Sequence, residues 1–365
     1  MAMRPPKKNA LLKIALLFLP VVLVITAITI PSFAAQSAPV PKAGSFSGEE
    51  AVREEKVGLF PVHIGGKYGF IDKTGEIVIK PQFDDTYGFH EGLAPVKIDG
   101  KWGYIDKTGE VVIKPQFDET WGFDEGLAAV YIGDKWGYID KTVNLVIKPR
   151  FLYYDARDFH EGRAAVRIGW KWGFIDKSGN LVIKFQFDNT GDFHEGLVSV
   201  KIGGKYGFID KTGNYVIKPQ FNSAGDFHEG LARVWMGDKC GFIDKTWKVV
   251  IKPQFYEYTG DFHEGLAYVT ISWGRRAYID QTGKIVIKRQ LYENFYEETG
   301  DFHEGLAAVK FDGKWGYIDK TGKFVIKPQF DDYAWGFDEG IAQVKIGGKY
   351  GYIDKTGRYV WKPTK

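Results

Sequence analysis

The chain reads Lys67-Tyr68-Gly69-Phe70-Ile71-Asp72-Lys73-Thr74-Gly75, and close variants of this stretch return eight more times. Neighbouring copies lie 34 to 39 residues apart, and the later ones begin at Lys101, Lys135, Lys171, Lys205, Lys239, Arg275, Lys314 and Lys349. A period of this length is typical of repeat architectures in which each repeat is one supersecondary unit. Residue types found in every copy are therefore expected to form the scaffold, and function is expected where the copies differ.

Cutting the sequence before a recurring glycine divides it into complete units. The nine units start near Gly58, Gly92, Gly126, Gly162, Gly196, Gly230, Gly265, Gly305 and Gly340. A length of 365 residues alone suggests two or three domains, but a uniform repeat predicts one continuous body. We therefore expect a single repeat domain over residues 57–365.

The second unit shows three short strands joined by tight turns. The expected strands are Leu93–Ile98, Lys101–Ile105 and Glu110–Lys114. Asp99-Gly100 suits a type I′ or II′ hairpin turn. In the second turn, Asp106 can accept backbone amides and Gly109 can supply a positive φ. Pro115 is expected to end the third strand, because proline cannot donate to the ladder.

Apolar residues fall on both faces of these strands, so neighbouring units are expected to cover one another. We predict an all-β fold of nine three-stranded antiparallel meander repeats, stacked as a β-solenoid or superhelix. The alternative is a β-propeller. Propeller blades usually have four strands and rarely number nine, and complete units at both ends leave no shared closing blade. Sheets that are buried on both faces favour the propeller.

The N-terminus has the pattern of a targeting segment. A basic start precedes an apolar run of 17 residues, Ile14–Ile30, and Ser32 and Ala34 form a small-x-small cleavage site. Residues 1–34 are therefore predicted to be a signal peptide and residues 35–56 a flexible linker. The alternative is an uncleaved anchor, because this length is near the lower limit for spanning a bilayer. Either case predicts a secreted, periplasmic or cell-envelope protein.

Charge and cysteine content exclude two classes. Four of the 49 basic residues and none of the 46 acidic ones lie in residues 1–34, which leaves 45 against 46, or −1, for the remainder. This balance gives no electrostatic case for nucleic acid binding. Cys240 is the single cysteine, so no internal disulfide framework exists. It replaces Trp or Tyr in its repeat and is expected to be a buried apolar substitute.

Asp-Lys-Thr-Gly occurs intact five times and also surrounds the phosphorylated aspartate of P-type ATPases. A nucleophile is not needed nine times, and the transmembrane body of such pumps is absent from the sequence, so we interpret the motif as a turn. Val143 and Trp247 replace its glycine in two copies. These copies predict weakened turns, with Asn144 taking the left-handed position in the first.

Phe-His-Glu-Gly is the second recurring motif, with Asp124 and Asp338 replacing the histidine in two units. The histidines are His90, His160, His194, His228, His263 and His303. Stacked repeats would place these side chains in a row along one edge. A metal ladder is one interpretation, and a side chain that accepts a turn amide is the other. We favour the second and predict no metal and no other cofactor.

Motifs for catalysis are missing. The sequence contains no Gly-x-Ser-x-Gly, no His-Glu-x-x-His and no phosphate-binding loop. Acidic residues recur everywhere, so no carboxylate pair for glycoside hydrolysis stands out. We expect a protein that is not an enzyme, and an enzyme acting on a polysaccharide is the alternative.

Variation concentrates in the connections between Pro-Gln-Phe and Phe-His-Glu-Gly, which differ in length and are rich in aromatic residues. The candidate ligand-binding residues are Tyr87, Trp121, Tyr153, Tyr154, Tyr256, Tyr258, Tyr292, Tyr296 and Trp335. Insertions in stacked repeats fall on one face, which is often the binding face. Exposed Tyr and Trp there would anchor a protein or stack on sugar rings. Alternatively, each aromatic closes the core beneath its own loop.

The composite motif resembles the WG (or KWG) repeat of bacterial proteins. The resemblance rests on Lys-Trp-Gly-Tyr-Ile-Asp-Lys-Thr-Gly, Val-Ile-Lys-Pro-Gln-Phe and Phe-x-Glu-Gly-Leu-Ala-x-Val, and it covers residues 58–363. Departures, most of them in the seventh unit, are Phe185, Cys240, Arg276, Ala277 and Arg289.

The resemblance implies an all-β repeat protein in an envelope or secreted setting, without a defined activity. We therefore expect a non-enzymatic scaffold that binds a protein or an envelope polysaccharide, with membrane contact only if the N-terminal segment stays uncleaved.

Overall fold

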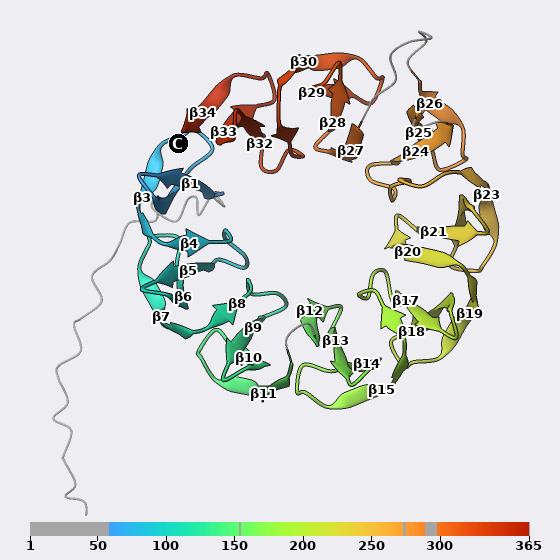
Figure 1. Cartoon of the computed structure of the whole chain (residues 1–365), viewed down its shortest axis with the longest axis horizontal. Helices are drawn as coiled ribbons and strands as arrows, with labels where there is room; N and C mark the ends of the chain where they lie inside the picture. The colour runs from blue at the N-terminus through green and yellow to red at the C-terminus, as the bar shows by residue number, and fades with distance from the viewer. Residues whose placement is uncertain (1–57, 153–154, 273–274, 289–297, 365) are drawn as a thin grey trace, which may run out of the picture. The chain divides into compact units, whose positions relative to one another are not determined.

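The computed structural model describes residues 58–152, 155–272, 275–288 and 298–364. The predicted signal peptide and linker lie outside the described residues. Every regular element within these ranges is a β-strand, and none of the described residues forms a helix that could span a membrane. Nine small antiparallel sheets follow one another around a ring (Figure 1). We number them blades 1 to 9 in chain order.

Blade 1 has three strands, and blades 2 to 5 have four strands each. Blade 1 contains β1 (Phe60–Ile64), β2 (Lys67–Ile71) and β3 (Ile77–Phe83). Blade 2 contains β4 (Asp85–Thr86), β5 (Ala94–Ile98), β6 (Lys101–Ile105) and β7 (Val111–Phe117). Blade 3 contains β8 (Glu119–Thr120), β9 (Leu127–Ile132), β10 (Lys135–Asp140) and β11 (Leu145–Phe151). Blade 4 contains β12 (Ala156–His160), β13 (Arg163–Ile168), β14 (Lys171–Ile175) and β15 (Leu181–Phe187). Blade 5 contains β16 (Asn189–Thr190), β17 (Leu197–Ile202), β18 (Lys205–Asp210) and β19 (Tyr215–Phe221).

Blade 7 has three strands among the described residues, and blades 6, 8 and 9 have four strands each. Blade 6 contains β20 (Ser223–His228), β21 (Leu231–Met236), β22 (Lys239–Asp244) and β23 (Val249–Phe255). Blade 7 contains β24 (Leu266–Ser272), β25 (Arg275–Asp280) and β26 (Ile285–Ile287). Blade 8 contains β27 (Glu298–His303), β28 (Leu306–Phe311), β29 (Lys314–Asp319) and β30 (Phe324–Phe330). Blade 9 contains β31 (Tyr333–Ala334), β32 (Ile341–Ile346), β33 (Lys349–Asp354) and β34 (Tyr359–Thr364).

The three predicted strands per unit are confirmed, and a fourth was missed. In blade 2 the register pairs Val96 with Gly103 and Tyr104 with Ile113, as a meander requires. The missed strand is the short β4, which lies at the inner rim and pairs with β5, whereas β7 lies at the outer rim (Figure 1). Seven of the nine sheets have four strands among the described residues. The inner strand precedes the glycine at which we cut the units, so the predicted boundaries assign it to the wrong repeat.

Both predicted turns are confirmed in blade 2. Asp99 and Gly100 have φ values of 49° and 80°, which is the two-residue hairpin geometry. Asp106 Oδ1 accepts the backbone N–H groups of Thr108 at 2.9 Å and Glu110 at 3.0 Å. The motif Asp-Lys-Thr-Gly is therefore a turn that places the outer strand.

Pro115 does not end its strand, contrary to the prediction. It lies inside β7, where the pairing with β6 shifts register between Trp102 and Tyr104. Proline is tolerated at a bulge on an outermost strand, because its missing N–H removes no regular ladder bond. The bulge explains the recurring glycine as well. A Cβ on Gly103 would lie 2.3 Å from the Ile113 carbonyl oxygen and 2.7 Å from Pro115 N.

The hydrophobic core lies between neighbouring blades. Trp102, Tyr104 and Ile113 of blade 2 form one buried cluster with Phe123 and Val130 of blade 3. This arrangement explains why both faces of each sheet carry apolar residues. Cys240 occupies such a cluster and is buried, as predicted, and burial raises the pKa of its thiol to about 12.

The arrangement of the units is a nine-bladed β-propeller, so the expected solenoid is wrong and the stated alternative is confirmed. Blade 9 contacts blade 1 and closes the ring (Figure 1). Tyr352 donates its hydroxyl to the Pro61 carbonyl oxygen at 2.9 Å, and Val62 and Ile341 share one buried cluster. The complete first and last units, which argued against closure, meet each other directly.

Phe60 completes this closing interface. In blade 2, Phe89 of the connection between β4 and β5 packs its ring against Phe70 of blade 1, with centroids 4.9 Å apart. Phe60 stands where blade 2 has Ala94, and its ring lies 5.7 Å from Tyr352 of blade 9. Phe60 of β1 thus makes at the blade 9–blade 1 interface the kind of aromatic contact that Phe89 makes at the blade 1–blade 2 interface.

Candidate functional site

Glutamate of Phe-His-Glu-Gly and lysine of Asp-Lys-Thr-Gly clamp neighbouring blades together. Glu91 and Gly92 have φ values of 49° and 86° and form a two-residue turn. The Glu91 carboxylate accepts the Gly126 N–H of blade 3 at 3.1 Å and lies 3.2 Å from Lys141 Nζ. The same pairing recurs around the ring, so these two motifs serve the scaffold. The side chain that accepts the turn amide is the glutamate, which corrects the assignment of this role to histidine or aspartate.

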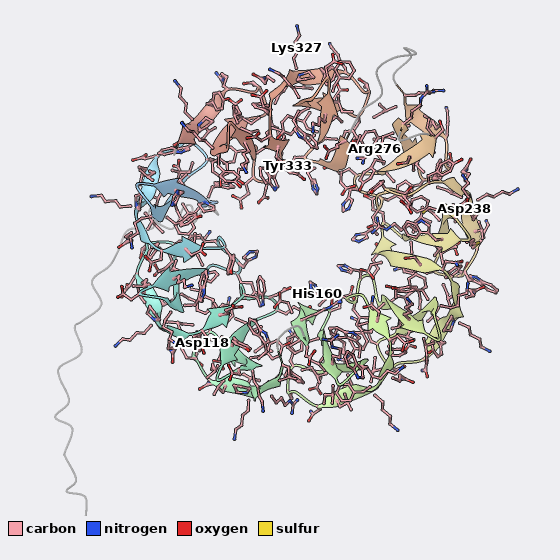
Figure 2. The ribbon with its side chains drawn as sticks, in the orientation of Figure 1. Asp118, His160, Asp238, Arg276, Lys327 and Tyr333 are labelled. Carbon is pink, nitrogen blue, oxygen red and sulfur yellow. The ribbon has the colours of Figure 1, made fainter. Side chains whose placement is uncertain are left out.

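The histidines form the expected row at the inner rim, where His160 faces the centre of the ring (Figure 2). From blade 4 to blade 8 the rings of His160, His194, His228, His263 and His303 follow one another with centroid separations of 5.6, 5.1, 5.3 and 5.5 Å. A metal ladder finds no support, since the described ranges contain no group of three or more ligating side chains that could hold an ion.

A second row, of carboxylates, precedes these histidines by two residues. Burial raises the pKa of Asp158 to about 6, with repulsion from Asp124 and Asp192 adding to the shift and His160 opposing it. Burial also raises the pKa of Asp226 and Asp301. The inner rim of blades 4, 6 and 8 therefore combines imidazoles with carboxyl groups that resist ionisation.

Two residues that follow a Thr or Ala at the inner rim differ between blades. They divide the ring into an aromatic arc and an arc with aspartate. In blades 2, 3 and 9 this pair is aromatic-glycine, namely Tyr87-Gly88, Trp121-Gly122 and Trp335-Gly336. In blades 5 to 8 it is Gly-Asp, and in blade 4 it is Arg157-Asp158. The sequence analysis noted the interrupted aromatic strip and missed this paired exchange, although aligned repeats contain the signal.

Two of the predicted binding residues meet in a stack across blades 2 and 3. Tyr87 lies 4.8 Å from Trp102 with planes 8° apart, and 5.6 Å from Trp121 with planes 27° apart. Trp121 in turn stacks on Trp136 at 6.3 Å. Tyr87 and Trp121 are 48 % and 44 % exposed. Each of the two rings therefore has aromatic neighbours on two sides and still exposes almost half of its surface.

The third predicted residue, Trp335, lines a pocket of about 390 Å³ at the seam between blades 9 and 1. Its ring is 5.9 Å from Tyr350, with planes inclined at 50°, so the two exposed rings form an open angle. Gln343 Nε2 donates to Tyr352 Oη at 3.0 Å and is thereby fixed. The lining combines aromatic with polar side chains, including Tyr68, Trp361, His63, Thr86 and Lys349.

Electrostatics in this pocket are mixed. Burial raises the pKa of Tyr68, and the charges of Asp85 and Tyr350 add to the shift. Lys345 Nζ lies 5.0 Å from the centre of the Tyr350 ring. Sequence reasoning missed Tyr68 and Tyr350 because they occupy the Trp/Tyr position of the Lys-x-Gly motif, which we had assigned to the scaffold.

The remaining predicted residues do not join these groups. Tyr256 and Tyr258 belong to the connection before β24 and are exposed, and they lie beside Lys239 and Arg276, respectively. Tyr153, Tyr154, Tyr292 and Tyr296 lie outside the described residues.

Comparison with solved structures supports the fold through a eukaryotic initiation factor. The eukaryotic initiation factor structure has a TM-score of 0.57 at 10 % identity and covers 84 % of this chain and 96 % of its own. BamB from Moraxella catarrhalis has a TM-score of 0.41 at 10 % identity over 75 % of this chain and 94 % of its own. No curated protein sequence matches the chain.

A family comparison covers most of the propeller. The family described as "WG containing repeat" matches eight consecutive segments, at residues 68–102, 102–136, 136–172, 172–206, 206–240, 241–271, 277–315 and 315–350. The matched segments contain the Lys-x-Gly strand, the Asp-Lys-Thr-Gly turn and the inner-rim glutamates. The chain therefore belongs to the WG-repeat family.

Proposed function

We propose that this propeller is a non-enzymatic binding scaffold outside the cytoplasm, which recognises a protein or an envelope polymer through the aromatic arc of blades 9, 1, 2 and 3. The observation that carries the proposal is the seam pocket, in which Trp335 and Tyr350 converge with His63, Gln343 and Lys349. A pocket of this volume, lined by aromatic and a few polar groups, is typical of ligand sites.

Pre-organisation supports the same proposal. Tyr352 is held by its bond to Pro61, and Gln343 is held by its bond to Tyr352, so two walls of the pocket are fixed across the seam. Rigid aromatic anchors contribute most of the binding energy in many interfaces because little entropy is lost on binding. The mixed lining suits a ligand with an apolar face and a polar rim, such as a sugar ring or a protein side chain.

The location outside the cytoplasm rests on the sequence. The basic start, the apolar run Ile14–Ile30 and the small residues after it have the pattern of a secretory signal. A chain with one buried cysteine gains no disulfide there, so its stability comes from the interfaces between blades.

Capture from envelope extract tests the proposal. The full chain is immobilised, and the double variant Trp335→Ala and Tyr350→Ala is compared with Tyr256→Ala and Tyr258→Ala, which removes two exposed aromatics outside the arc. We expect the first variant to lose at least about tenfold in affinity for the captured component, as loss of two anchors predicts. Equal capture by both variants would remove the seam pocket from the binding surface.

A second candidate is an enzyme acting on a polysaccharide, favoured by Asp158. A carboxyl group with a pKa of about 6 stays partly protonated near neutral pH, as a general acid for glycoside cleavage must. Asp124 and Asp192 both contribute to this shift and are the candidates for the second carboxylate. Turnover of oligosaccharides by the pure protein, lost in Asp158→Asn and kept in Asp106→Asn, would establish this activity. A protein that releases no product at any pH would eliminate it.

A further inference from the structure

Exposed apolar side chains form a belt around the outer rim of the propeller. In blades 1 to 8 each outermost strand begins with two exposed or half-exposed apolar residues, followed by a buried one and an exposed lysine, as in Val249, Val250, Ile251 and Lys252. Lys327 shows the outward direction of these lysines (Figure 2). The exposed apolar members are Ile77, Val78, Val111, Val112, Leu145, Val146, Leu181, Val182, Tyr215, Val216, Val249, Val250, Ile285, Val286, Val325 and Tyr359.

Charge is distributed unevenly along this belt. The residue before the apolar pair is glutamate in blades 1 and 2, asparagine in blades 3 to 5, and lysine or arginine in blades 6 to 9. From blade 3 onward the described outer strands and these preceding residues contain no acidic residue, and in blades 6 to 9 the preceding residue adds a positive charge. The cationic residues of the described outer strands and preceding positions in blades 6 to 9 are Lys248, Lys252, Lys284, Lys323, Lys327, Arg358 and Lys362. In a chain that is close to neutral overall, this segregation marks one side of the ring.

The aspartate of each turn offsets part of the charge of the cationic residue that precedes the outer strand: Arg358 Nη2 lies 3.1 Å from Asp354 Oδ2, and the charge of Lys248 acts on Asp244. Asp244 is the closest acidic residue in sequence to the pair Val249 and Val250, and it belongs to the preceding turn. Its Oδ1 accepts the backbone N–H groups of Thr246 and Lys248, each at 2.9 Å, so it is held within its own turn. The lysines of the outer strand remain exposed to solvent.

Trp247 stands in blade 6, where the run of cationic preceding residues begins, and in a position that favours glycine. Its φ is 71°, and the equivalent Gly283 of blade 7 has a φ of 83° and packs against Ile251 of the preceding blade. Trp247 is instead 54 % exposed. A left-handed conformation is costly for a residue with a side chain, and folding gains little from an aromatic that projects into solvent. Such strain at an exposed site points to a function for the side chain.

We propose that the outer rim of blades 5 to 7, centred on Trp247, docks edge-on to an anionic lipid surface. Tryptophan and small apolar side chains favour the boundary between headgroups and acyl chains, and lysines reach the phosphates while their stems lie along the apolar surface. A flat bilayer touches only one arc of a ring, which agrees with the confinement of the cationic preceding residues to blades 6 to 9. A soluble polyanion would satisfy the lysines and leave Trp247 and the valines unused.

Co-sedimentation with vesicles tests the proposal. The full chain is mixed with vesicles of phosphatidylcholine alone or of phosphatidylcholine with about a third phosphatidylglycerol, and any affinity of the apolar N-terminal run is common to all variants. We expect Trp247→Gly to lower binding to the anionic vesicles at least about fivefold, and Lys248→Gln with Lys252→Gln and Lys284→Gln to lower it and weaken its salt dependence. Trp247→Gly relieves strain, so it will fold, which a thermal melt verifies.

Matched controls lie on the opposite arc. Val143→Gly makes the same change at the same turn position in blade 3, and Lys80→Gln with Lys114→Gln and Lys148→Gln removes three lysines from blades 1 to 3. Both controls should bind as the unchanged chain does. The proposal fails if Trp247→Gly binds normally, if the controls lose as much as the test variants, or if zwitterionic and anionic vesicles bind equally. Dextran sulfate binding that depends on the lysines and not on Trp247 would assign the rim to soluble polyanions instead.

Discussion

Backbone strain at single residues distinguishes two turns from the other seven. Val143 has a φ of 68° and Trp247 one of 71°, whereas the equivalent position in every other blade is a glycine. The sequence predicts that both turns are weakened, but each keeps its hydrogen bonds: Asp140 Oδ1 accepts the Thr142 and Asn144 amides at 2.9 Å, and Asp244 Oδ1 accepts those of Thr246 and Lys248 at 2.9 Å. The prediction that Asn144 takes the left-handed position is wrong, because Val143 keeps it. Asn144 Nδ2 donates instead to Asp140 Oδ2 at 2.9 Å and supports the turn from outside.

We expect Val143→Gly to stabilise the protein by about 1 kcal/mol, because a β-branched residue is costly in the left-handed region and glycine is not. The gain is partly offset by the greater freedom of glycine in the unfolded chain. Denaturant unfolding measures the change. Gly109→Val in blade 2 is the reciprocal variant and should destabilise by a similar amount or more, because its Cβ would lie 3.0 Å from Ile79. A Val143→Gly protein that is less stable than its parent would contradict the argument.

At the scale of elements, the sequence predicts the strands that alternate and misses the one that does not. Lys101–Ile105 matches β6 at both ends, because the motif and the two turns bound it. Asp85–Thr86 has only two residues, which is too short for any alternation, and its pairing with Lys97 and Val96 depends on tertiary contact. Pro115 misled the prediction for β7, because proline at a bulge does not end a strand.

The glutamate that links neighbouring blades makes two contacts of different strength, a hydrogen bond from a backbone amide and an ion pair with a lysine. Glu195 accepts the Gly230 N–H at 3.1 Å and lies 3.0 Å from Lys245 Nζ. Burial acts to raise the pKa of Glu195, but the bonds from Lys245 and Gly230 outweigh it, so its pKa is lowered. In blade 7 a glutamine replaces the lysine, and Gln281 Nε2 still reaches Glu229 at 3.1 Å.

Lys245→Gln should therefore cost well under 1 kcal/mol, since the ion pair is partly exposed and glutamine can keep the contact. Glu195→Ala should cost about 1 kcal/mol or more, because it also leaves the Gly230 amide without its acceptor. Chemical denaturation of the two variants gives the comparison. If the lysine variant proved the more damaging, the ion pair and not the amide bond would hold the blades together.

At the scale of the whole molecule, the repeat predicts stacking and does not predict closure. A solenoid and a propeller bury the same recurring residues, and only the rotation between neighbouring blades separates them. Phe60 is the residue that bears on the question, because it stands where other units have alanine or valine and contacts Tyr352 at the far end of the chain. The candidate site was predictable only in part, because the sequence does not predict closure. The position of Trp335 differs between repeats and was therefore noticed, but its partners across the seam become neighbours only when the ring closes.

Phe60→Ala should destabilise the protein by about 2 kcal/mol, although alanine is the commonest residue at that position in the other blades. The ring of Phe60 closes the interface between blades 9 and 1, and its loss leaves a void against Tyr352. Phe60→Leu should retain most of the stability. Thermal unfolding, followed by near-ultraviolet circular dichroism of the aromatic residues, reports the change. A neutral Phe60→Ala variant would mean that the two end blades gain little from their contact.

Two sets of carboxyl groups make the stability of the whole ring depend on pH in opposite directions. The aspartates of the nine turns have lowered pKa values. The hydrogen bond from the Thr108 hydroxyl is the largest cause of the lowered pKa of Asp106. Burial acts to raise this pKa, and the hydrogen bond from the Glu110 amide lowers it further. A lowered folded pKa gives stability that is present above the ordinary value of 3.8 and is lost as the pH falls through the folded value. Repetition around the ring should make the loss below about pH 4 steep.

Asp158 acts in the other direction, because its folded pKa of about 6 is raised above 3.8. The folded state holds this proton more tightly, so stability rises as the pH falls through 6 and is lost again as the pH rises past it. Asp226 and Asp301, also raised, add to the same trend. We expect maximal stability between about pH 4 and 6. Asp158→Asn should stabilise the protein at pH 7 by on the order of 2–3 kcal/mol and flatten the profile between pH 6 and 4. Denaturant midpoints across this range test both arms, and a parent protein that is more stable at pH 7 than at pH 5 would show that the inner-rim carboxyls are ionised without cost.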